Sequence, residues 1–538
     1  MATTPPPPLA PHSALHEHAT TAELLIRALS QNPDAVALTI GDLTLTRAEM
    51  ARRISQFAQE FAGRGIGPGT PVAILAKSTA DALLAQFAAQ TRGARLTLLS
   101  ASASTEDLAF ILDDAEIEVL IVDAGAFGDT ITTLNWERRS RCQILTLGAA
   151  AVGDDVAHAS RAHTPTPLSF AGRGPEGMSS IAYTGGTTGR PKGVIGTFTS
   201  AATLIQIQLS EWEWPNRPTL LLTTPLTHAG GTFVLPALLR GGRVIVLPTF
   251  HAATVLETIE RERVDTMFVV PTMLYALLNA PGSFDTSSLT TVYYGAAPIL
   301  PARLASAIAR FGPVFFQFYG QTECGMTIAV LKREEHTPNR LTTCGRPVPW
   351  LDVALLDSDG ARVATGEVGE VCVRGPLVAA GYWNRPEQTA ETFRGEWLHT
   401  GDLGRFDADG YLTLVDRSKD VIISGGFNVY SAEVETVIAA LPSVADVAVV
   451  GVPHEYWGES VTALVVPASG SRVDADALVR IVRERRGAVH APKDVVFVDV
   501  LPKTPLGKVD KAAARRLAAS LLAAPHQPDV GTIAGVAN

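Results

Sequence analysis

Residues 183–194 read Tyr-Thr-Gly-Gly-Thr-Thr-Gly-Arg-Pro-Lys-Gly-Val and follow the strand-like approach Ser180-Ile181-Ala182. Glycines let backbone N–H groups converge on an anion, because no Cβ stands in the way. The hydroxyls of Thr184, Thr187 and Thr188 add donors, and Lys192 adds a positive charge. A Gly-rich stretch alone would be an ordinary flexible loop, but these donors and cations together predict a polyphosphate site. The spacing of the last glycine and the lysine differs from that of the common P-loop.

The composition narrows the class of protein. With 538 residues the chain is expected to hold more than one domain, since single cores stop growing near roughly 250–300 residues. A hydrophobic content of 46% and a charged content of 18% indicate a globular protein. A net charge of −10 argues against a nucleic-acid partner, which would require a basic surface. No apolar run is long enough to span a bilayer and the first residues lack a signal core, so we expect a cytoplasmic protein.

The four cysteines are widely scattered along the sequence. Their spacing fits neither a disulfide framework nor a zinc motif. We therefore expect buried thiols at Cys142, Cys324, Cys344 and Cys372.

Two hydrophobic periodicities alternate and predict an α/β fold in which helices cover parallel sheets. Strands are expected at 72–76, 119–122, 243–247, 267–270, 291–294 and 314–318, and helices at 46–61, 80–91, 253–263, 273–278 and 302–310. Between 353 and 415, strand-like runs alternate with Gly/Asp turns, which predicts a small β-barrel or meander. After Asp416, helices at 431–441, 474–485 and 511–522 and strands at 446–452, 460–466 and 495–500 predict a compact α+β domain.

These patterns also predict the domain boundaries. Residues 19–416 form the large N-terminal domain, 417–421 the connection and 422–524 the C-terminal domain. The polar, proline-containing ends, 1–18 and 525–538, are expected to be disordered.

Three further segments carry polar side chains suited to a nucleotide. Gln317-Phe318-Tyr319-Gly320-Gln321-Thr322-Glu323 follows a predicted strand, where the functional residues of α/β sheets gather. Its tyrosine can stack on a base, its threonine can donate to phosphate and Glu323 can hold Mg²⁺. Asp402, at the end of residues 397–402, can accept ribose hydroxyls, and residues 502–508 present Lys508. Taken singly, Glu323 is also a surface carboxylate or helix cap, Asp402 a turn aspartate and Lys508 a solubilising charge.

In this order and spacing, the motifs resemble those of the adenylate-forming superfamily. This superfamily includes acyl- and aryl-CoA synthetases, luciferases and nonribosomal adenylation domains. The resemblance runs from about residue 23 to 522 and is strongest to stand-alone acyl-CoA synthetases. It rests on the Gly-rich loop, Tyr-Gly-Gln-Thr-Glu, Thr-Gly-Asp, Asp-Arg-Ser-Lys-Asp and Gly-Lys-Val-Asp-Lys. It implies two helix-covered sheets and a small barrel, followed by a mobile C-terminal domain.

The resemblance assigns a role to each matching position. The implied catalytic residues are Lys508, Thr184, Glu323 and Lys192, with Glu323 on the metal and Lys419 as the hinge. The implied nucleotide-binding residues are Thr184, Gly185, Gly186, Thr187, Thr188, Gly189, Lys192, Gly295, Ala296, Ala297, Pro298, Gln317, Phe318, Tyr319, Gly320, Gln321, Thr322, Asp402, Arg417 and Lys508.

The remaining implied residues concern the acid and the thiol. The acyl pocket is expected at His228, Gly230, Ala296, Gly320, Gly325 and Met326, with glycines leaving room for the acyl group. His228 is equally well read as a helix-start histidine packed against the pocket wall. Coenzyme A is expected at Gly425, Gly426, Phe427 and Trp457, although Trp457 also fits a core tryptophan. Two positions depart from the family pattern: Gly185 replaces a common serine and Ser431 a common proline.

The resemblance implies a two-step reaction with ATP, Mg²⁺ and CoA. The acid's carboxylate attacks the α-phosphorus of ATP and releases pyrophosphate. A thiol then attacks the acyl-adenylate and releases AMP, after rotation of the C-terminal domain. The main alternative is an acyl-AMP ligase that loads a carrier protein. A catalytically inactive adenylate sensor and a luciferase-like monooxygenase are further alternatives. The identity of the acid and the oligomeric state are not predicted.

Overall fold

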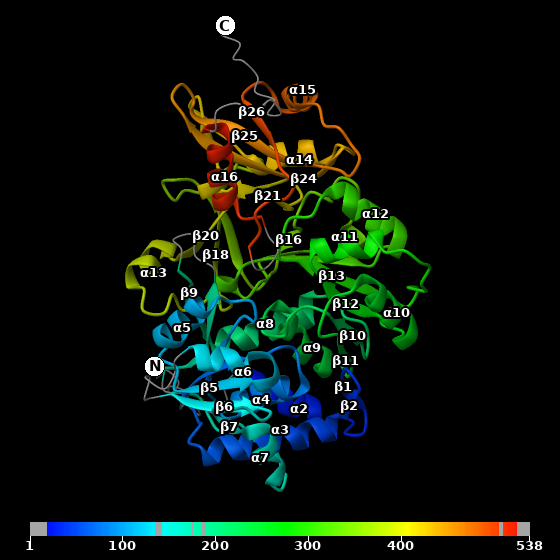
Figure 1. Cartoon of the computed structure of the whole chain (residues 1–538), viewed down its shortest axis with the longest axis vertical. Helices are drawn as coiled ribbons and strands as arrows, with labels where there is room; N and C mark the ends of the chain where they lie inside the picture. Colours follow the sequence, from blue (N-terminus) through cyan, green and yellow to red (C-terminus); the bar gives the residue numbers. More distant parts are fainter. Residues whose placement is uncertain (1–18, 135–141, 175, 185–189, 505–508, 524–538) are drawn as a thin grey trace, which may run out of the picture.

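The computed structural model describes residues 19–134, 142–174, 176–184, 190–504 and 509–523. The predicted disordered segments 1–18 and 525–538 lie outside these ranges. The described chain forms four sheets, three in its first three quarters and one after residue 421 (Figure 1).

The largest sheet has nine strands and a parallel centre. Its edge strands β2 and β16, and β15 next to β16, pair antiparallel with their neighbours. In spatial order the strands are β16 (Arg346–Pro347), β15 (Ala329–Leu331), β14 (Phe315–Tyr319), β13 (Thr291–Gly295), β12 (Thr266–Val269), β10 (Thr219–Leu222), β11 (Arg243–Val246), β1 (Val36–Ile40) and β2 (Leu43–Thr46).

The second sheet has seven strands and is parallel except for its last member. The strand predicted before the Gly-rich loop is confirmed as β8, and the chain returns antiparallel to it as β9, which the sequence pattern did not predict. In spatial order the strands are β7 (Asp154–Asp155), β6 (Gln143–Leu147), β5 (Val119–Asp123), β3 (Pro71–Leu75), β4 (Arg95–Leu98), β8 (Met178–Thr184) and β9 (Lys192–Thr197).

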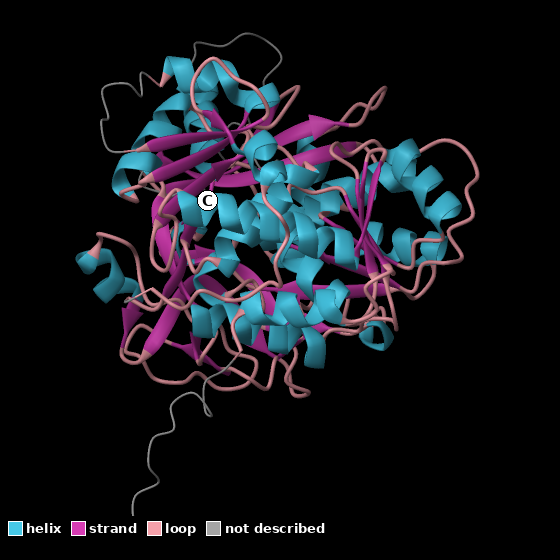
Figure 2. Ribbon diagram, turned by 90° about the horizontal axis from the view of Figure 1, so that it is seen from below, coloured by secondary structure: helices cyan, strands magenta, loops and turns pink. Residues whose placement is uncertain are grey.

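Helices cover both faces of the two large sheets (Figure 2). Between the sheets lie α2 (Thr21–Ser30), α3 (Arg47–Gly63), α4 (Ala80–Thr91), α8 (Phe198–Glu211) and α9 (Val234–Leu239). Outside the seven-stranded sheet lie α5 (Thr105–Asp114) and α6 (Ala124–Thr133), and outside the nine-stranded sheet α10 (Ala252–Glu262), α11 (Pro271–Asn279) and α12 (Pro301–Phe311).

Burial on both faces explains why the strands read as continuous apolar runs rather than alternating ones. Along β3, Val72 and Ile74 enter the core between the sheets, whereas Ala73 and Leu75 enter the outer core. Successive side chains of a strand point to opposite faces, so each run supplies two cores. The predicted parallel sheets with helical cover are confirmed.

The third sheet is small and antiparallel, as the Gly/Asp turns predicted. Its order is β17 (Asp352–Leu356), β18 (Gly369–Arg374), β20 (Trp397–Phe406) and β19 (Phe393–Arg394), with β21 (Leu412–Arg417) also paired to β20. Helix α13 (Pro386–Thr392) precedes β19.

The C-terminal lobe lies at the top of Figure 1. Its sheet runs β23 (Phe427–Val429), β22 (Ile422–Ser424), β25 (Gly458–Pro467) and β24 (Val444–His454), with β26 (Asp494–Phe497) paired to β25. Helices α14 (Ser431–Ala439), α15 (Ala475–Arg486) and α16 (Lys511–Ala523) pack around cores of their own, which confirms the predicted α+β character.

The structure also shows the burial of the cysteines and the length and apolarity of the helices. Cys324, Cys344 and Cys372 are buried thiols, as predicted, whereas Cys142 is only half-buried. Among the helices that the structure describes, none is both long enough and apolar enough to cross a membrane.

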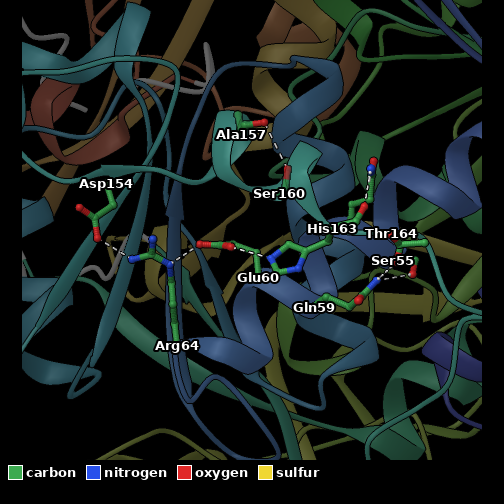
Figure 3. A network of polar contacts seen from close by, with 10 residues as sticks. Ser55, Gln59, Glu60, Arg64, Asp154, Ala157, Ser160, His163 and Thr164 are labelled. Carbon is green, nitrogen blue, oxygen red and sulfur yellow. Dashed lines mark hydrogen bonds and ion pairs between the residues drawn. The ribbon is translucent and has the colours of Figure 1, made fainter.

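Helix α3 is fixed in place from both ends. Thr46 and Glu49 form a capping box at its start, which confirms the predicted N-cap. Near its end, Glu60 bonds to Arg64 and to His163, and Arg64 reaches Asp154 with 2.6 Å between Nη1 and Oδ2 (Figure 3). These ion pairs hold the segment around α7 (Val156–Ala159) against the helix.

Arg47, the first residue of α3, is a fully buried cation. Its guanidinium donates to the backbone carbonyls of Ala28, Leu238 and Gly242. Burial lowers the pKa of Arg47. Because these carbonyls belong to α2, α9 and the turn before β11, one side chain joins three elements.

We expect Arg47→Met to lower the free energy of unfolding by about 2–4 kcal/mol, because it leaves buried carbonyls without donors. Urea unfolding followed by circular dichroism measures this as an earlier first transition. Arg52→Met is the matched control, since the side chain of Arg52 is 61% exposed and pairs only weakly with Glu49. Equal transitions for the two variants would contradict the assignment.

Candidate active site

The candidate site lies where β13 and β14 end, at the carboxyl edge of the nine-stranded sheet. Loops 295–298 and 320–326 leave the sheet here. Tyr319, the last residue of β14, contacts β20 of the small sheet, and Ala379, in the segment after β18, bonds to Glu323 of the loop 320–326. Strand ends of α/β sheets are the usual position of ligand sites.

Tyr319, Asp402 and Arg417 form a bonded group. The hydroxyl of Tyr319 donates to Oδ2 of Asp402 at 2.7 Å, and Nε of Arg417 lies 2.9 Å from Oδ1. Asp402 and Arg417 are cross-strand partners on β20 and β21. Burial and the carboxylate raise the pKa of Tyr319 well above its usual value, and the same carboxylate raises the pKa of Arg417. Both oxygens of Asp402 retain a lone pair for further donors, such as two adjacent hydroxyls.

An irregularity in the small sheet directs Asp402 toward Tyr319. The pairing of β18 with β20 shifts register between Glu370 and Cys372, and Gly401 has a φ of +72°. A carboxylate oxygen of Glu370 accepts the N–H of Gly401 at 3.0 Å, and Thr400 Oγ1 accepts the N–H of Asp402 at 3.1 Å. Glu370 is therefore a supporting residue that the sequence motifs did not reveal.

The Gly-rich loop joins the end of β8 to the start of β9. Thr184 and Lys192 are partners at that end, so the two predicted phosphate contacts flank the loop. The Lys192 ammonium lies 5.2 Å from the ring centre of Tyr382. Residues Gly185, Gly186, Thr187, Thr188 and Gly189 lie outside the described residues, and their contact with phosphate stays a prediction.

Tyr382 connects this hairpin to Glu323, although no sequence motif singled it out. Its hydroxyl donates to Oε1 of Glu323 at 2.8 Å. Burial, followed by the Glu323 carboxylate, raises the pKa of Tyr382. Backbone bonds from Ile195 to Gly381 and from Trp383 to Gly193 attach this segment to β9 through an isolated antiparallel bridge between Val194 and Tyr382. The only local signal was an aromatic pair after a glycine, which is not specific.

Glu323 is suited to a hard cation. It is half-buried in the short helix η4 (Thr322–Cys324), and within the described residues no partner contacts its second oxygen. Carboxylate oxygens are the ligands that Mg²⁺ prefers. Thr322 beside it is exposed and so accessible to a phosphate.

The first segment predicted around the base is residues 295–298. A Cβ on Gly295 would lie 2.5 Å from the carbonyl oxygen of Phe318, so only glycine fits there. Ala296 has a φ of +66°, and Ala297 and Pro298 follow it at the surface of the site.

Residues 317–321 point in different directions along β14 and the loop that follows it. Gln317 accepts the Tyr294 hydroxyl at 3.0 Å. The side chain of Phe318 stacks on Trp212 in the core, which leaves only its backbone for a ligand. Gly320 packs against the backbone of Met326, and the carbonyl of Gln321 accepts the Met326 N–H.

The residues predicted for the acyl pocket come from two loops that meet. Thr232, in the short helix η3 (Ala229–Phe233), places its hydroxyl 3.4 Å from the sulfur of Met326. His228 occupies the N-cap position of η3, next to the Thr227 hydroxyl at 2.9 Å, and burial lowers its pKa. Burial therefore favours the neutral imidazole.

The glycines of these loops have close neighbours in the direction that a side chain would take. A Cβ on Gly230 would lie 2.3 Å from Thr224 Oγ1, and one on Gly325 2.6 Å from a methyl of Leu377. The missing side chains permit close packing of the loops themselves, and the expectation that these glycines make room for the acyl group stays a prediction. Their place in the pocket wall stays a prediction.

The residues predicted for CoA gather on the C-terminal sheet. The N–H of Gly425 donates to the Trp457 carbonyl at 2.8 Å, and the Lys493 ammonium lies 5.2 Å from the Trp457 ring centre. Phe427 is 61% exposed, and a Cβ on Gly426 would meet open space. Trp457 is half-buried at a hairpin tip, so it is not a core tryptophan.

The connection between the lobes is the short helix η6 (Ser418–Asp420), which contains Lys419. Burial lowers the pKa of Lys419. Beside it, a carboxylate oxygen of Asp416 accepts both the N–H and the hydroxyl of Ser431. A proline at this position would lack that N–H, so the departure from the family pattern adds two hydrogen bonds. Lys508 lies outside the described residues.

The chain is similar to known proteins. The sequence matches the AMP-binding enzyme family over residues 25–383 and the C-terminal domain of AMP-binding enzymes over residues 433–508. It is 48% identical to the medium/long-chain-fatty-acid–CoA ligase FadD8 of Mycobacterium tuberculosis, over 91% of this chain and 89% of that protein. It is 39% identical to a feruloyl-CoA synthase of Amycolatopsis, over 91% and 97%.

Solved structures agree with this relationship. The amide bond synthetase McbA of Marinactinospora thermotolerans superposes with a TM-score of 0.86 at 36% identity, over 92% of this chain and 99% of that chain. The o-succinylbenzoate CoA synthetase of Bacillus subtilis, in complex with its acyl-adenylate intermediate, gives 0.81 at 28% identity, over 91% and 97%. The chain therefore belongs to the family of AMP-binding, adenylate-forming enzymes.

Proposed function

We propose that the chain is an acid–CoA ligase that activates a medium- or long-chain fatty acid with ATP through an acyl-adenylate. The observation that carries this proposal is that contacts connect the Tyr319–Asp402–Arg417 group, the Thr184–Lys192 hairpin end and Glu323, which come from three different sheets and the loop after β14. The choice of acid is supported by the 48% identity to a fatty-acid–CoA ligase. ATP and CoA are cytoplasmic metabolites, so the proposal places the enzyme in the cytoplasm.

In the first step, the acid's carboxylate attacks the α-phosphorus of ATP, the bond to the β-phosphate oxygen breaks and pyrophosphate leaves. Tyr319 offers a ring face to the base, and Asp402 accepts the ribose hydroxyls. Thr184 and Lys192 offer a hydroxyl and a charge to the phosphates, where negative charge grows in the transition state. Lys508 is assigned the contact that joins the carboxylate to the α-phosphate.

Mg²⁺ is included in the proposal because Glu323 has an oxygen available for it. When bound, the ion neutralises charge on the phosphate oxygens. Tyr382 restricts the Glu323 carboxylate to one orientation, because its hydroxyl bonds to Oε1.

In the second step, the CoA thiol attacks the acyl carbonyl, loses its proton and expels AMP. We assign the exposed Gly425–Phe427 turn and Trp457 to the thiol substrate, and Lys419 to the rotation that brings them to the acyl group. Two relatives suggest other acceptors: a fatty acid–[acyl-carrier-protein] ligase of Streptomyces coeruleorubidus at 31% identity, and the amide bond synthetase.

The proposal is tested by offering purified protein ATP and Mg²⁺ with octanoate, palmitate, ferulate or indoleacetate. Each acid is assayed with CoA, with a loaded carrier protein and with a simple amine, and AMP and acyl products are measured. We expect acyl-CoA from a fatty acid at the highest kcat/KM. Product formed only with the carrier protein, or only with the amine, would show that this compound rather than CoA is the acceptor. No AMP with any acid would refute the adenylation proposal.

Tyr382→Phe isolates the orientation of Glu323, because the ring and its contact with Lys192 remain. We expect the exchange of pyrophosphate into ATP to slow about 10- to 100-fold, since a hydrogen bond to a charged group contributes about 1.5–3 kcal/mol. The Mg²⁺ concentration for half-maximal rate should also rise. Tyr411→Phe is the matched control, because the Tyr411 hydroxyl donates to Glu335 at 2.7 Å instead. An unchanged Mg²⁺ dependence in Tyr382→Phe would contradict this role.

A further inference from the structure

Glu370, Cys372 and His399 form a compact cluster of metal-ligating side chains on the small antiparallel sheet. Glu370 and Cys372 stand two residues apart on β18 and so share one face of the strand. His399 on β20 is the direct cross-strand partner of Cys372. One ligand atom from each side chain lies within 4.8 Å of the other two.

The distances approach those of a tetrahedral site. Nδ1 of His399 lies 3.4 Å from Sγ of Cys372 and 2.7 Å from Oε2 of Glu370. With zinc–ligand bonds of about 2.0–2.3 Å, ligand atoms in a tetrahedral site are about 3.3–3.6 Å apart. Side-chain rotations therefore suffice to bring the three ligand atoms to the spacing of a coordination site.

The surroundings are those of a supported site. Cys372 is buried against Ala354, Leu356 and Trp397, while the side chains of His399 and Glu370 remain 9% and 21% exposed. The second oxygen of Glu370 accepts the Gly401 N–H, which orients the carboxylate as outer hydrogen bonds do around metals. Arg394 lies 3.5 Å from Glu370, but its side chain is 52% exposed and its guanidinium also donates to the carbonyl of Glu391.

We propose that Glu370, Cys372 and His399 bind a thiophilic divalent metal such as Zn²⁺ or Cd²⁺, and that the bound ion inhibits nucleotide binding. A thiol, an imidazole and one carboxylate select such metals over Mg²⁺, so this site is distinct from Glu323. On binding, the metal–sulfur bond replaces the S–H bond and one proton is released. The imidazole of His399 changes tautomer, so that its proton moves from Nδ1 to Nε2, the hydrogen bond to Glu370 is lost and the freed Nδ1 lone pair binds the metal.

Inhibition follows from the position of the ligands and rests on the proposed function. His399 lies three residues before Asp402, and Glu370 holds the intervening Gly401. Coordination draws both ligands toward the ion and alters the bulge that directs Asp402 toward Tyr319. The nucleotide site then loses its acceptor geometry without any metal at Glu323.

Binding is tested on the full-length protein with Cd²⁺ alone, through the ultraviolet absorption of the cadmium–thiolate bond. We compare the natural chain with Cys372→Ser and with Cys344→Ser, a matched buried thiol that contacts the Leu412 carbonyl. The natural chain and Cys344→Ser should bind one tight equivalent, and Cys372→Ser should lose it. A band that persists in Cys372→Ser, or that is missing from the natural chain, would overturn the site.

Inhibition is tested by adding Zn²⁺ to the exchange of pyrophosphate into ATP at saturating Mg²⁺. Cys372→Ser should need at least about tenfold more Zn²⁺ for half inhibition, and a chelator should restore activity in the natural chain. Equal inhibition of both proteins would assign the effect to Glu323 and overturn the regulatory part. Because the cadmium measurement requires no catalysis, it also decides the metal site if the proposed reaction fails.

Discussion

The hydrogen-bonded carboxylate of Asp402 is the contact on which the arrangement of the site depends. It joins Tyr319 at the end of the large sheet to Arg417 at the end of the small sheet. Arg417 is also the last residue before the connection to the C-terminal lobe. One buried anion therefore fixes the distance between two sheets and the point from which the second lobe departs. A buried charge persists only when it is paired, so Tyr319 and Arg417 hold it in a defined place.

The layered core explains why such an anion can be held so firmly. Each central strand is packed on both faces, which prevents the strand ends from shifting. The site then requires only short additions to this base: a glycine that lets β13 approach β14, a hairpin that carries Thr184 and Lys192, and the segment around Tyr382 that ties the hairpin to Glu323. Function is placed in loops, whereas the sheets supply rigidity.

Many of the helices and strands were predictable from the sequence, because hydrophobic periodicity and helix capping depend on residues that are close together in the chain. The helix capped by Thr46, the strand before the Gly-rich loop and the α+β pattern after Asp416 all appear where the sequence placed them. The bonded group of Tyr319, Asp402 and Arg417 unites residues that the motifs had named separately. Side-chain direction was harder: Phe318 faces the core because β14 alternates, and a Cβ on Gly230 or Gly325 would meet a neighbouring loop.

Contacts between residues on different strands could not be predicted from the spacing of residues along the sequence. Tyr382 reaches Glu323 from a different segment, and Glu370 reaches Gly401 only because of a bulge. A search for metal motifs by residue spacing does not find Cys372 and His399, because only the register of β18 and β20 places these two residues side by side. The fold decides these contacts, and the fold depends on pairings between distant parts of the chain.

The most direct test of this account is calorimetric titration of ATP into the natural protein and into Asp402→Asn. The substitution keeps the size and the Tyr319 partner of the side chain but removes its charge. The account predicts a loss of affinity of about tenfold or more and a lower melting temperature, because Arg417 loses its charged partner. Equal affinities for ATP would contradict the central role of this carboxylate.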